Sequence, residues 1–289
     1  MPRIPDDFLK AVVFIYPSQD AALEGLPEGG SGFLVSHGTP ESDLRTCYVV
    51  TNAHVVESGG QWVRLDDGRI VNIPNEDWQT GIPDDYAVAR LTVSDCTNTV
   101  QFPIETMALT PEEAQELNVG PGDDTFMIGR FSGHAGRAAN NPVARFGNIS
   151  LMPNRDDPIL DGRGHRVEAY LVEMHTLSGF SGSAVCLLIE SGSFRGNSYA
   201  NPSTEIRLLG IDTGQKLIPI PVKEQAPPGH WTVRSDLRID AMTAISIVTP
   251  IWKVTERLLR DDMAQERAEH AEQQLLARQT TTASHTDTD

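Results

Sequence analysis

Short apolar runs separated by turn residues make up most of the chain before residue 250. The runs that we interpret as strands lie at residues 29–36, 49–54, 62–71, 85–93, 125–130, 143–150, 168–173, 184–189, 206–211 and 245–248. Asp67 and Gly68, within the third run, are a hairpin signal because tight two-residue turns favour that pair. Many short strands with turns between them are typical of an all-β sandwich or barrel, and they argue against a parallel sheet.

The remaining stretches depart from this pattern. Residues 8–16 form an apolar arm that we expect to lie along the body as a strand, and residues 111–122 predict a short helix stopped by Gly and Pro. Residues 191–204 are rich in Ser, Gly and Asn, and residues 216–240 hold several prolines. We interpret both as long loops, which are usually functional or mobile.

After residue 250 the period changes to that of a helix. Apolar residues recur at roughly helical spacing, at Trp252, Leu258, Leu259, Met263, Ala268, Ala271 and Leu275. No clean heptad is present, which favours a partly solvated helix over a coiled-coil or partner contact. The last residues are polar and predict a disordered tail.

Charge and cysteine usage narrow the function. A net charge of −17 and a pI of about 4.8 disfavour nucleic acid and anionic membrane surfaces as partners. The N-terminus lacks a charged segment followed by an apolar core, and no stretch is long enough to span a membrane, so we predict a cytoplasmic protein made without export. Cys47, Cys96 and Cys186 are odd in number and lack metal-type spacing, which indicates free thiols in a reducing compartment, with no metal and no cofactor.

One Gly-rich loop, residues 178–185 (Ser-Gly-Phe-Ser-Gly-Ser-Ala-Val), has the features of a nucleophile loop. Glycines on either side of Ser181 permit a tight turn that exposes its hydroxyl, and the N–H groups of Gly179 and Ser181 are placed to hold a developing oxyanion. A plain Gly/Ser turn between strands is the alternative. A serine nucleophile also needs a base and an orienting acid, and His54 and Asp85 precede it, each beside an apolar run.

Three motifs together resemble the trypsin-like serine peptidases of chymotrypsin fold. They are Thr-Asn-Ala-His-Val-Val at residues 51–56, Asp-Tyr-Ala-Val at 85–88 and Gly-Phe-Ser-Gly-Ser-Ala at 179–184. The α/β-hydrolase elbow is disfavoured, since it needs glycine at 183 and the order Ser, acid, His. The resemblance covers residues 26–255 and implies two six-stranded antiparallel β-barrels with a C-terminal α-helix.

The implied organisation divides the chain as follows. The boundaries are an arm at 1–25, an N-terminal barrel at 26–105, a linker at 106–122, a C-terminal barrel at 123–249, a helix at 250–278 and a disordered tail at 279–289.

The resemblance also implies roles for single residues. His54 is the general base, Ser181 the nucleophile, and Asp85 the orienting acid, because the family motif places the acid directly before x-Ala-Val. Asp84 is then a solvated loop acid. We assign no catalytic role to the other histidines that sit in Gly-rich loops, His134 and His165.

Residues 210–215 resemble the family strand that pairs with the substrate backbone. Thr213 matches a position whose hydroxyl often contacts the triad acid, Gly214 follows it, and the P1 pocket is expected to be lined by Asp212 and His175. An ionised Asp212 favours Arg or Lys at P1. A protonated His175 paired with Asp212 leaves a neutral pocket that favours small apolar side chains, and both possibilities stay open.

Activation should not require cleavage of a proenzyme. Phe180 stands where the secreted digestive enzymes carry the acid that pairs with a new N-terminus, and no activation sequence is present. In this the chain is closer to the high-temperature-requirement and glutamyl-endopeptidase types, without a PDZ domain, and loops or a partner are expected to order the oxyanion hole.

An active endopeptidase acting on protein or peptide substrates is favoured, because an inactive relative has no reason to retain all three groups. The alternative is a catalytically silent trypsin-like scaffold that acts as a binding or regulatory protein through its C-terminal helix.

Overall fold

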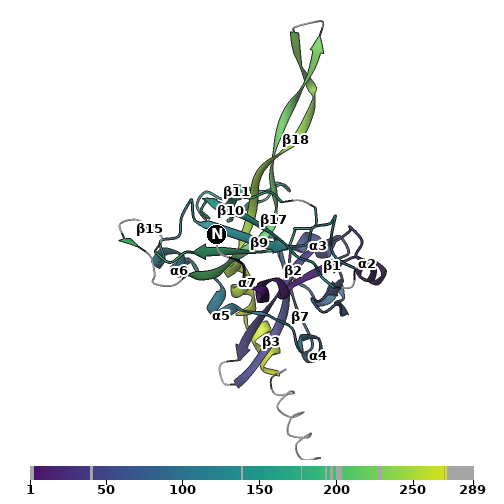
Figure 1. Cartoon of the computed structure of the whole chain (residues 1–289), viewed down its shortest axis with the longest axis vertical. Coiled ribbons are helices and arrows are strands. Elements are labelled where there is room, and N and C mark those ends of the chain that lie inside the picture. The colour runs from purple at the N-terminus through teal and green to yellow at the C-terminus, as the bar shows by residue number, and fades with distance from the viewer. Residues whose placement is uncertain are drawn as a thin grey trace, which may run out of the picture.

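Two β-rich halves lie side by side, and a long two-stranded ribbon projects from one of them (Figure 1). The structure is a computed structural model that describes residues 3–39, 42–137, 139–176, 178–192, 194–195, 198–199, 204–226, 230–269 and 271. The predicted all-β class with C-terminal helices is confirmed.

The first half is built on one eight-stranded sheet. Its path runs β5-β4-β1-β2-β3-β7-β6, and β8 pairs in parallel with β2. The bounds are β1 Val12–Tyr16, β2 Gly30–Thr39, β3 Ser42–Thr51, β4 Trp62–Arg64, β5 Ile70–Asn72, β6 Gln79–Gly81, β7 Tyr86–Arg90 and β8 Phe102–Pro103. The predicted six-stranded barrel is therefore an open sheet here, because the three-residue end strands β5 and β6 do not pair with each other within the described chain.

The second half closes into the six-stranded barrel that was predicted. Its order is β10-β13-β18-β17-β14-β9. The bounds are β9 Asp124–Gly129, β10 Val143–Leu151, β13 Tyr170–Glu173, β14 Ala184–Ile189, β17 Glu205–Ala226 and β18 His230–Pro250. All six residues of β14 are buried, so this strand reads as a continuous apolar run instead of an alternating one.

A shared apolar cluster holds the halves together. Phe33 and Val50 of the first sheet belong to the same buried cluster as Phe126 and Ile211 of the barrel. Each half also has its own cluster, around Val49 in the first and around Phe180 in the second. Because interiors pack at crystal-like density, this arrangement fixes the loops that meet between the halves.

The N-terminal arm contributes to the body in two ways. Helix α1 (Asp6–Lys10) precedes β1, so the strand predicted over residues 8–16 starts only at Val12. Strand β1 is completely buried and pairs with both β2 and β4, which makes it a central strand of the sheet. Helix α2 (Gln19–Glu24) follows, capped by the Ser18 hydroxyl and ended by Gly25 at φ 67°.

Short elements make up the connections. They are α3 Ala53–Glu57, η1 Asn75–Asp77, α4 Val93–Cys96, α5 Ile104–Met107, α6 Pro111–Glu116, β11 Ile159–Leu160, β12 Arg166–Val167, β15 Phe194–Arg195 and β16 Ser198–Tyr199. Helix α6, with a capping box between Thr110 and Glu113, is the short helix expected in the linker. Of the predicted loop at 191–204, the described residues include the small β15–β16 pair, and several others lie outside the described residues.

The region predicted as a long loop at residues 216–240 is instead the distal part of the β17–β18 hairpin. We call residues 216–226 and 230–243 the arm, and Figure 1 shows it rising clear of the body. The strand pattern was present in the alternation of Trp231, Val233, Leu237 and Ile239 with polar residues. The prolines on the opposite strand favoured the loop interpretation instead.

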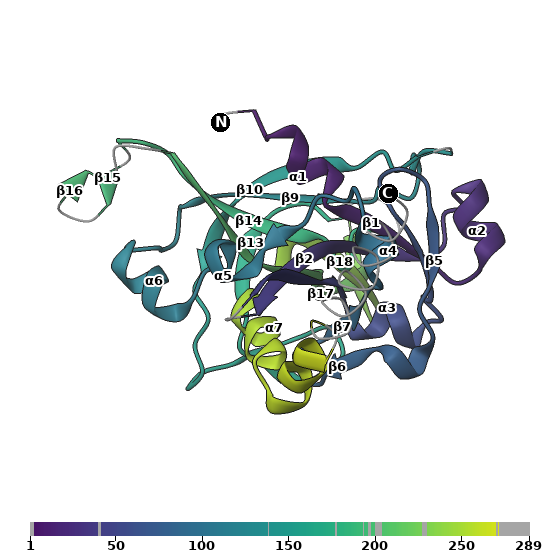
Figure 2. The ribbon, with the colours of Figure 1, turned by 90° about the horizontal axis from the view of Figure 1, so that it is seen from below.

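The C-terminal helix is in two pieces. Helix α7 (Ile251–Leu258) packs on the barrel strands, as the resemblance implied, and residues 261–269 form a second helical segment. That segment lies on the first half, where Glu266 pairs with Arg90 at 2.6 Å and Met263 is buried (Figure 2). Of the predicted continuation to 278, the structure describes Ala271, which is buried; the residues after it and the tail at 279–289 lie outside the described residues.

Candidate active site

His54 lies just after strand β3, at the start of a short helix. The strand ends at Thr51, and α3 begins at Ala53, which places His54 in the first turn of α3. Its backbone N–H donates to Asp85 Oδ1 at 3.0 Å, and its Nδ1 lies 2.8 Å from Asp85 Oδ2. The His54 side chain is 32% exposed and that of Asp85 only 3%, so the ring is bonded on its buried Nδ1 edge and is partly exposed to solvent.

Asp85 is held in an unusual backbone conformation. Its φ is 55°, in the left-handed region that residues other than Gly seldom adopt, and the Asn52 amide donates to its carbonyl at 2.9 Å. Such strain concentrates at functional sites, where the surrounding structure enforces it.

Asp84, the rival acid, points elsewhere. Its carboxylate lies 3.9 Å from Lys253 Nζ, and its carbonyl accepts from the Thr249 hydroxyl at 2.6 Å. Burial raises the pKa of Asp84, and the Lys253 cation opposes that rise. The structure therefore brings Asp85, and not Asp84, to His54.

The Ser181 loop is tied to the first half of the molecule. Ser31 of β2 donates its N–H to the Ser181 carbonyl at 2.8 Å and its hydroxyl to the Gly179 carbonyl at 2.7 Å. The same hydroxyl accepts the Arg130 N–H at 2.7 Å. Sequence analysis gave residues 29–36 only as a strand and did not single out Ser31.

Two glycines give the loop its shape. Gly179 and Gly182 have φ of 98° and 90°. A Cβ on Gly182 would lie 2.0 Å from the Ser31 carbonyl oxygen, so only glycine permits this approach. In the described part of the chain, the N–H groups of Gly179 and Ser181 make no hydrogen bond.

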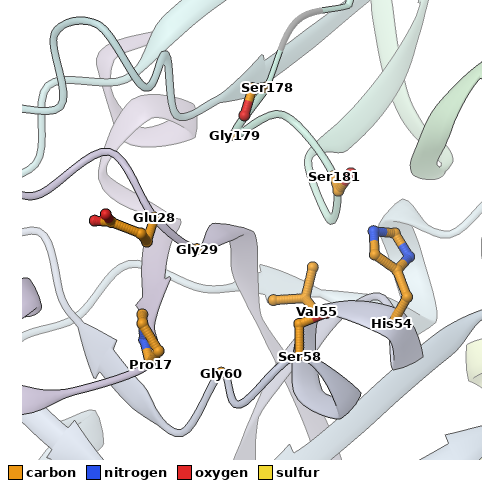
Figure 3. A pocket seen from close by; sticks show the side chains of 10 residues that line it. All are labelled: Pro17, Glu28, Gly29, His54, Val55, Ser58, Gly60, Ser178, Gly179 and Ser181. Carbon is orange, nitrogen blue, oxygen red and sulfur yellow. The ribbon is translucent and has the colours of Figure 1, made fainter.

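His54, Gly179 and Ser181 line one pocket of about 390 Å³ (Figure 3). The imidazole ring of His54 is turned toward the loop that carries Ser181. No hydrogen bond joins the two side chains among the described residues, and catalytic contacts are often long before a substrate binds. The pocket is within the size range of ligand sites in proteins.

Phe180 anchors the same loop without a charge. Its side chain is fully buried in the barrel core, and the Arg145 guanidinium lies 5.6 Å from the ring centroid. Burial of this apolar side chain holds the loop without an ion pair to a chain N-terminus.

Arg163 is a site residue that sequence analysis missed. It lies in the turn between β11 and β12, and its Nη2 is 2.8 Å from Asp85 Oδ2, the oxygen that also faces His54. Asp161 Oδ1 accepts the Arg163 N–H at 2.9 Å and the His165 N–H at 2.7 Å, which fixes the turn. No sequence motif predicts this contact, because it joins a turn of the barrel half to a loop of the other half.

Thr213 and Gly214 line a second pocket of about 300 Å³ with His54 and Arg163. The Thr213 hydroxyl donates to the Ile247 carbonyl at 2.9 Å and so is not directed to Asp85, where the resemblance had placed it. Arg163 occupies that side of the carboxylate instead.

Asp212 is completely buried beside the site. The Ser246 hydroxyl donates to its Oδ1, and within the described residues its Oδ2 has no hydrogen-bond partner. Burial raises the pKa of Asp212 to about 7, while the Ser246 hydroxyl, the Gly214 N–H and the His54 charge act in the opposite direction.

The other candidate histidines stay apart from these groups. His175 is exposed, and no contact with Asp212 is formed in the described chain. His134 is exposed, and His165 Nδ1 lies 3.6 Å from Asp161. Across the described ranges, no group of three or more His, Cys, Asp or Glu side chains is arranged to hold a metal ion.

The family follows from comparison of the sequence. The profile of the trypsin-like peptidase domain matches residues 30–194, more than half of the chain, and the three motifs lie inside this range. The chain belongs to the trypsin-like peptidase family and is a serine peptidase. Comparison with curated protein sequences found no match.

Solved structures show likenesses of lower strength. The Rv3671c protease from M. tuberculosis in its active form is 16% identical, with a TM-score of 0.47, and 89% of this chain and 91% of that chain are covered. The HtrA-type protease AlgW with a decapeptide is 17% identical with a TM-score of 0.47, covering 91% of this chain and 65% of that chain. Deg5 is 18% identical with a TM-score of 0.41, covering 72% and 81%. At these levels no residue role is taken from them.

No helix in the described part of the chain is both long and apolar enough to cross a membrane.

Proposed function

We propose that the chain is a serine endopeptidase that works through Ser181, His54 and Asp85. Ser181 Oγ attacks the scissile carbonyl, His54 Nε2 takes its proton and passes it to the leaving amine, and Asp85 stabilises the imidazolium through Nδ1. Water then attacks the acyl-enzyme by the same route. The observation that carries the proposal is the 2.8 Å contact between His54 Nδ1 and Asp85, which leaves Nε2 free toward the pocket shared with Ser181.

The oxyanion is stabilised by the N–H groups of Gly179 and Ser181. Both are unbonded in the described chain, and Gly179 has the positive φ that brings successive N–H groups toward one point. The Ser31 contacts to the carbonyls on the far side of the loop hold these donors in place before substrate arrives.

The substrate backbone pairs with the edge of β17 at Thr213 and Gly214, which line the pocket next to His54. Asp212 follows in the same strand, but its side chain is completely buried and accepts a hydrogen bond from Ser246, so its carboxyl does not face a bound P1 side chain in this conformation. The P1 preference stays a prediction.

Activity does not require proteolytic cleavage of a proenzyme. Phe180 is held by the barrel core, and Ser31 holds the loop from the other half, so neither contact needs a new N-terminus. Activity is instead regulated by loops, and the β11–β12 turn influences the site through the contact of Arg163 with Asp85. Mass spectrometry of the active species, with Met1 still attached, supports this; activity appearing only after N-terminal removal contradicts it.

An intracellular setting agrees with the thiols. All three cysteines are free, Cys47 and Cys186 are buried, and burial raises the pKa of Cys186. The substrates are proteins or peptides. Contact with a partner through the C-terminal helix stays a prediction, because most of the segment after residue 269 lies outside the described residues.

Reaction with a fluorophosphonate probe tests the proposal. Wild type should be labelled at Ser181, and Ser181→Ala or His54→Ala should lower kcat by on the order of 10⁶. Asp85→Asn should cost about 10⁴, while Asp84→Asn, the matched neighbour, leaves activity nearly unchanged. Full activity in Ser181→Ala refutes the assignment of Ser181 as the nucleophile. Loss of activity in Asp84→Asn but not in Asp85→Asn would assign the orienting acid to Asp84.

A further inference from the structure

Among the described residues, the arm carries more exposed large apolar side chains than any other part of the molecule. They are 41% to 64% exposed and comprise Leu217, Ile218, Ile220, Trp231, Val233, Leu237, Ile239 and Met242. The arm stands away from the body, so neither half covers it (Figure 1). An isolated two-stranded ribbon is marginally stable in water, and additional strands stabilise it. The arm therefore has the properties of an interaction surface.

Strand addition is blocked along one edge of the arm. Pro219 pairs with Asp240 and Pro221 with Arg238 across the hairpin. Proline has no N–H, so these pairs occupy positions without hydrogen bonds between β17 and β18, and the peptide groups of the prolines face outward. The outer edge of β17 lacks two donors there, which guards it against another strand.

The other edge of the arm is open. In the same register, the N–H and C=O groups of Arg238 and Asp240 point away from β17, toward the free edge of β18. Residues 230–243 contain no proline, and no strand of the described chain pairs with this edge until β13 meets Ile245. One edge is thus protected and the other is available for pairing.

We propose that β18 pairs in antiparallel fashion with β18 of a second copy of this chain, centred on Ile239. In this register Arg238 of each copy lies opposite Asp240 of the other, and the two Ile239 residues face each other. A centre on residue 238 or 240 would instead oppose like charges, and a shift by one residue on one strand would oppose apolar and charged side chains. Both Arg238 and Asp240 are exposed and have no partner among the described residues.

Charge and shape agree with this pairing. The whole chain has a net charge of −17, yet residues 216–240 hold four Lys and Arg against three Asp and Glu. Two arms can therefore approach without the repulsion that opposes contact between the bodies. The product is a four-stranded sheet in which Ile218, Ile220 and Ile239 of both copies form one apolar surface.

A charge-swap series tests the register by sedimentation equilibrium of the full chain. Arg238→Asp or Asp240→Arg each replaces two attractive cross-strand pairs with repulsive ones and should weaken dimerisation roughly 10- to 100-fold. The double variant Arg238→Asp/Asp240→Arg should restore it. Labelling by a fluorophosphonate probe, unchanged in all three variants, shows that the body is folded.

Disulfide trapping tests the centre. Facing residues without hydrogen bonds across antiparallel strands have Cα atoms about 4.5 Å apart, which suits a disulfide. Ile239→Cys should form a covalent dimer on mild oxidation, while the matched Ile220→Cys, three strand spacings (about 14 Å) from its counterpart, should not. A monomer at all concentrations, no rescue in the double variant, or equal trapping at both positions overturns the proposal.

Discussion

Asp212 makes stability depend on pH in a direction opposite to that of most carboxylates. The carboxyl is completely buried, and its pKa rises from 3.8 to about 7 mainly because burial disfavours the charged form. The folded state therefore holds a proton that the unfolded state releases near pH 3.8. This contribution is complete below about pH 4, falls between about pH 4 and 7, and is lost above about pH 7.

The size of the effect follows from the displacement of the pKa. About three units at 1.36 kcal/mol each give about 4 kcal/mol in total, of which about 3 kcal/mol falls between about pH 5 and pH 8. Asp212→Asn cannot ionise and keeps an acceptor for the Ser246 hydroxyl. Relative to this variant, the wild-type free energy of unfolding should decrease by about 3 kcal/mol over that interval.

Urea unfolding at a series of pH values measures the difference, with Ser181→Ala in both proteins to prevent self-cleavage. Ser246→Ala is an informative companion, because the Ser246 hydroxyl lowers the pKa of Asp212, and its loss should move the decrease to higher pH. Parallel curves for wild type and Asp212→Asn would show that the carboxyl is not protonated when folded, and would refute the reasoning.

Three further substitutions probe the surroundings of the site. Arg163→Gln removes the guanidinium that lies 2.8 Å from Asp85, and the loss of this ion pair should lower kcat/KM for a peptide substrate about 2- to 10-fold; an unchanged kcat/KM contradicts the coupling. Gly182→Ala places a Cβ against the Ser31 carbonyl at positive φ and should cost about 2–4 kcal/mol of unfolding free energy by urea titration, with activity lost. Ser31→Ala leaves two buried backbone groups without a partner and should cost about 2–4 kcal/mol of unfolding free energy, with kcat reduced more than KM changes; a raised KM with unchanged kcat would assign Ser31 to binding alone.

Local patterns sufficed for much of the fold. The Asp67-Gly68 turn signal predicts the β4–β5 hairpin, and the run at residues 111–122, stopped by Gly and Pro, predicts the short helix α6, because both depend on neighbours in the chain. The order of motifs placed His54 and Asp85 near each other, and the structure brings them to 2.8 Å.

Contacts between distant segments could not be predicted in this way. Arg163 reaches Asp85 from a turn in the other half, and Ser31 reaches Gly179 across a separation of 148 residues. Neither has a local signature, since each depends on how the halves dock. The arm was missed for another reason, because Pro219 and Pro221 indicate a loop unless their outward-facing edge position is known.

The bonds from Ser31 have a thermodynamic consequence for the molecule as a whole. The Ser181 loop belongs to the barrel, yet its conformation is held by a strand of the open sheet, and Asp85 of that sheet is in turn held by Arg163 of the barrel. The geometry of the proposed site is therefore linked to the docking equilibrium of the two halves. A change that separates the halves slightly should lower activity without contacting Ser181, His54 or Asp85, and a peptide bound across both halves should, by reciprocity, tighten their association.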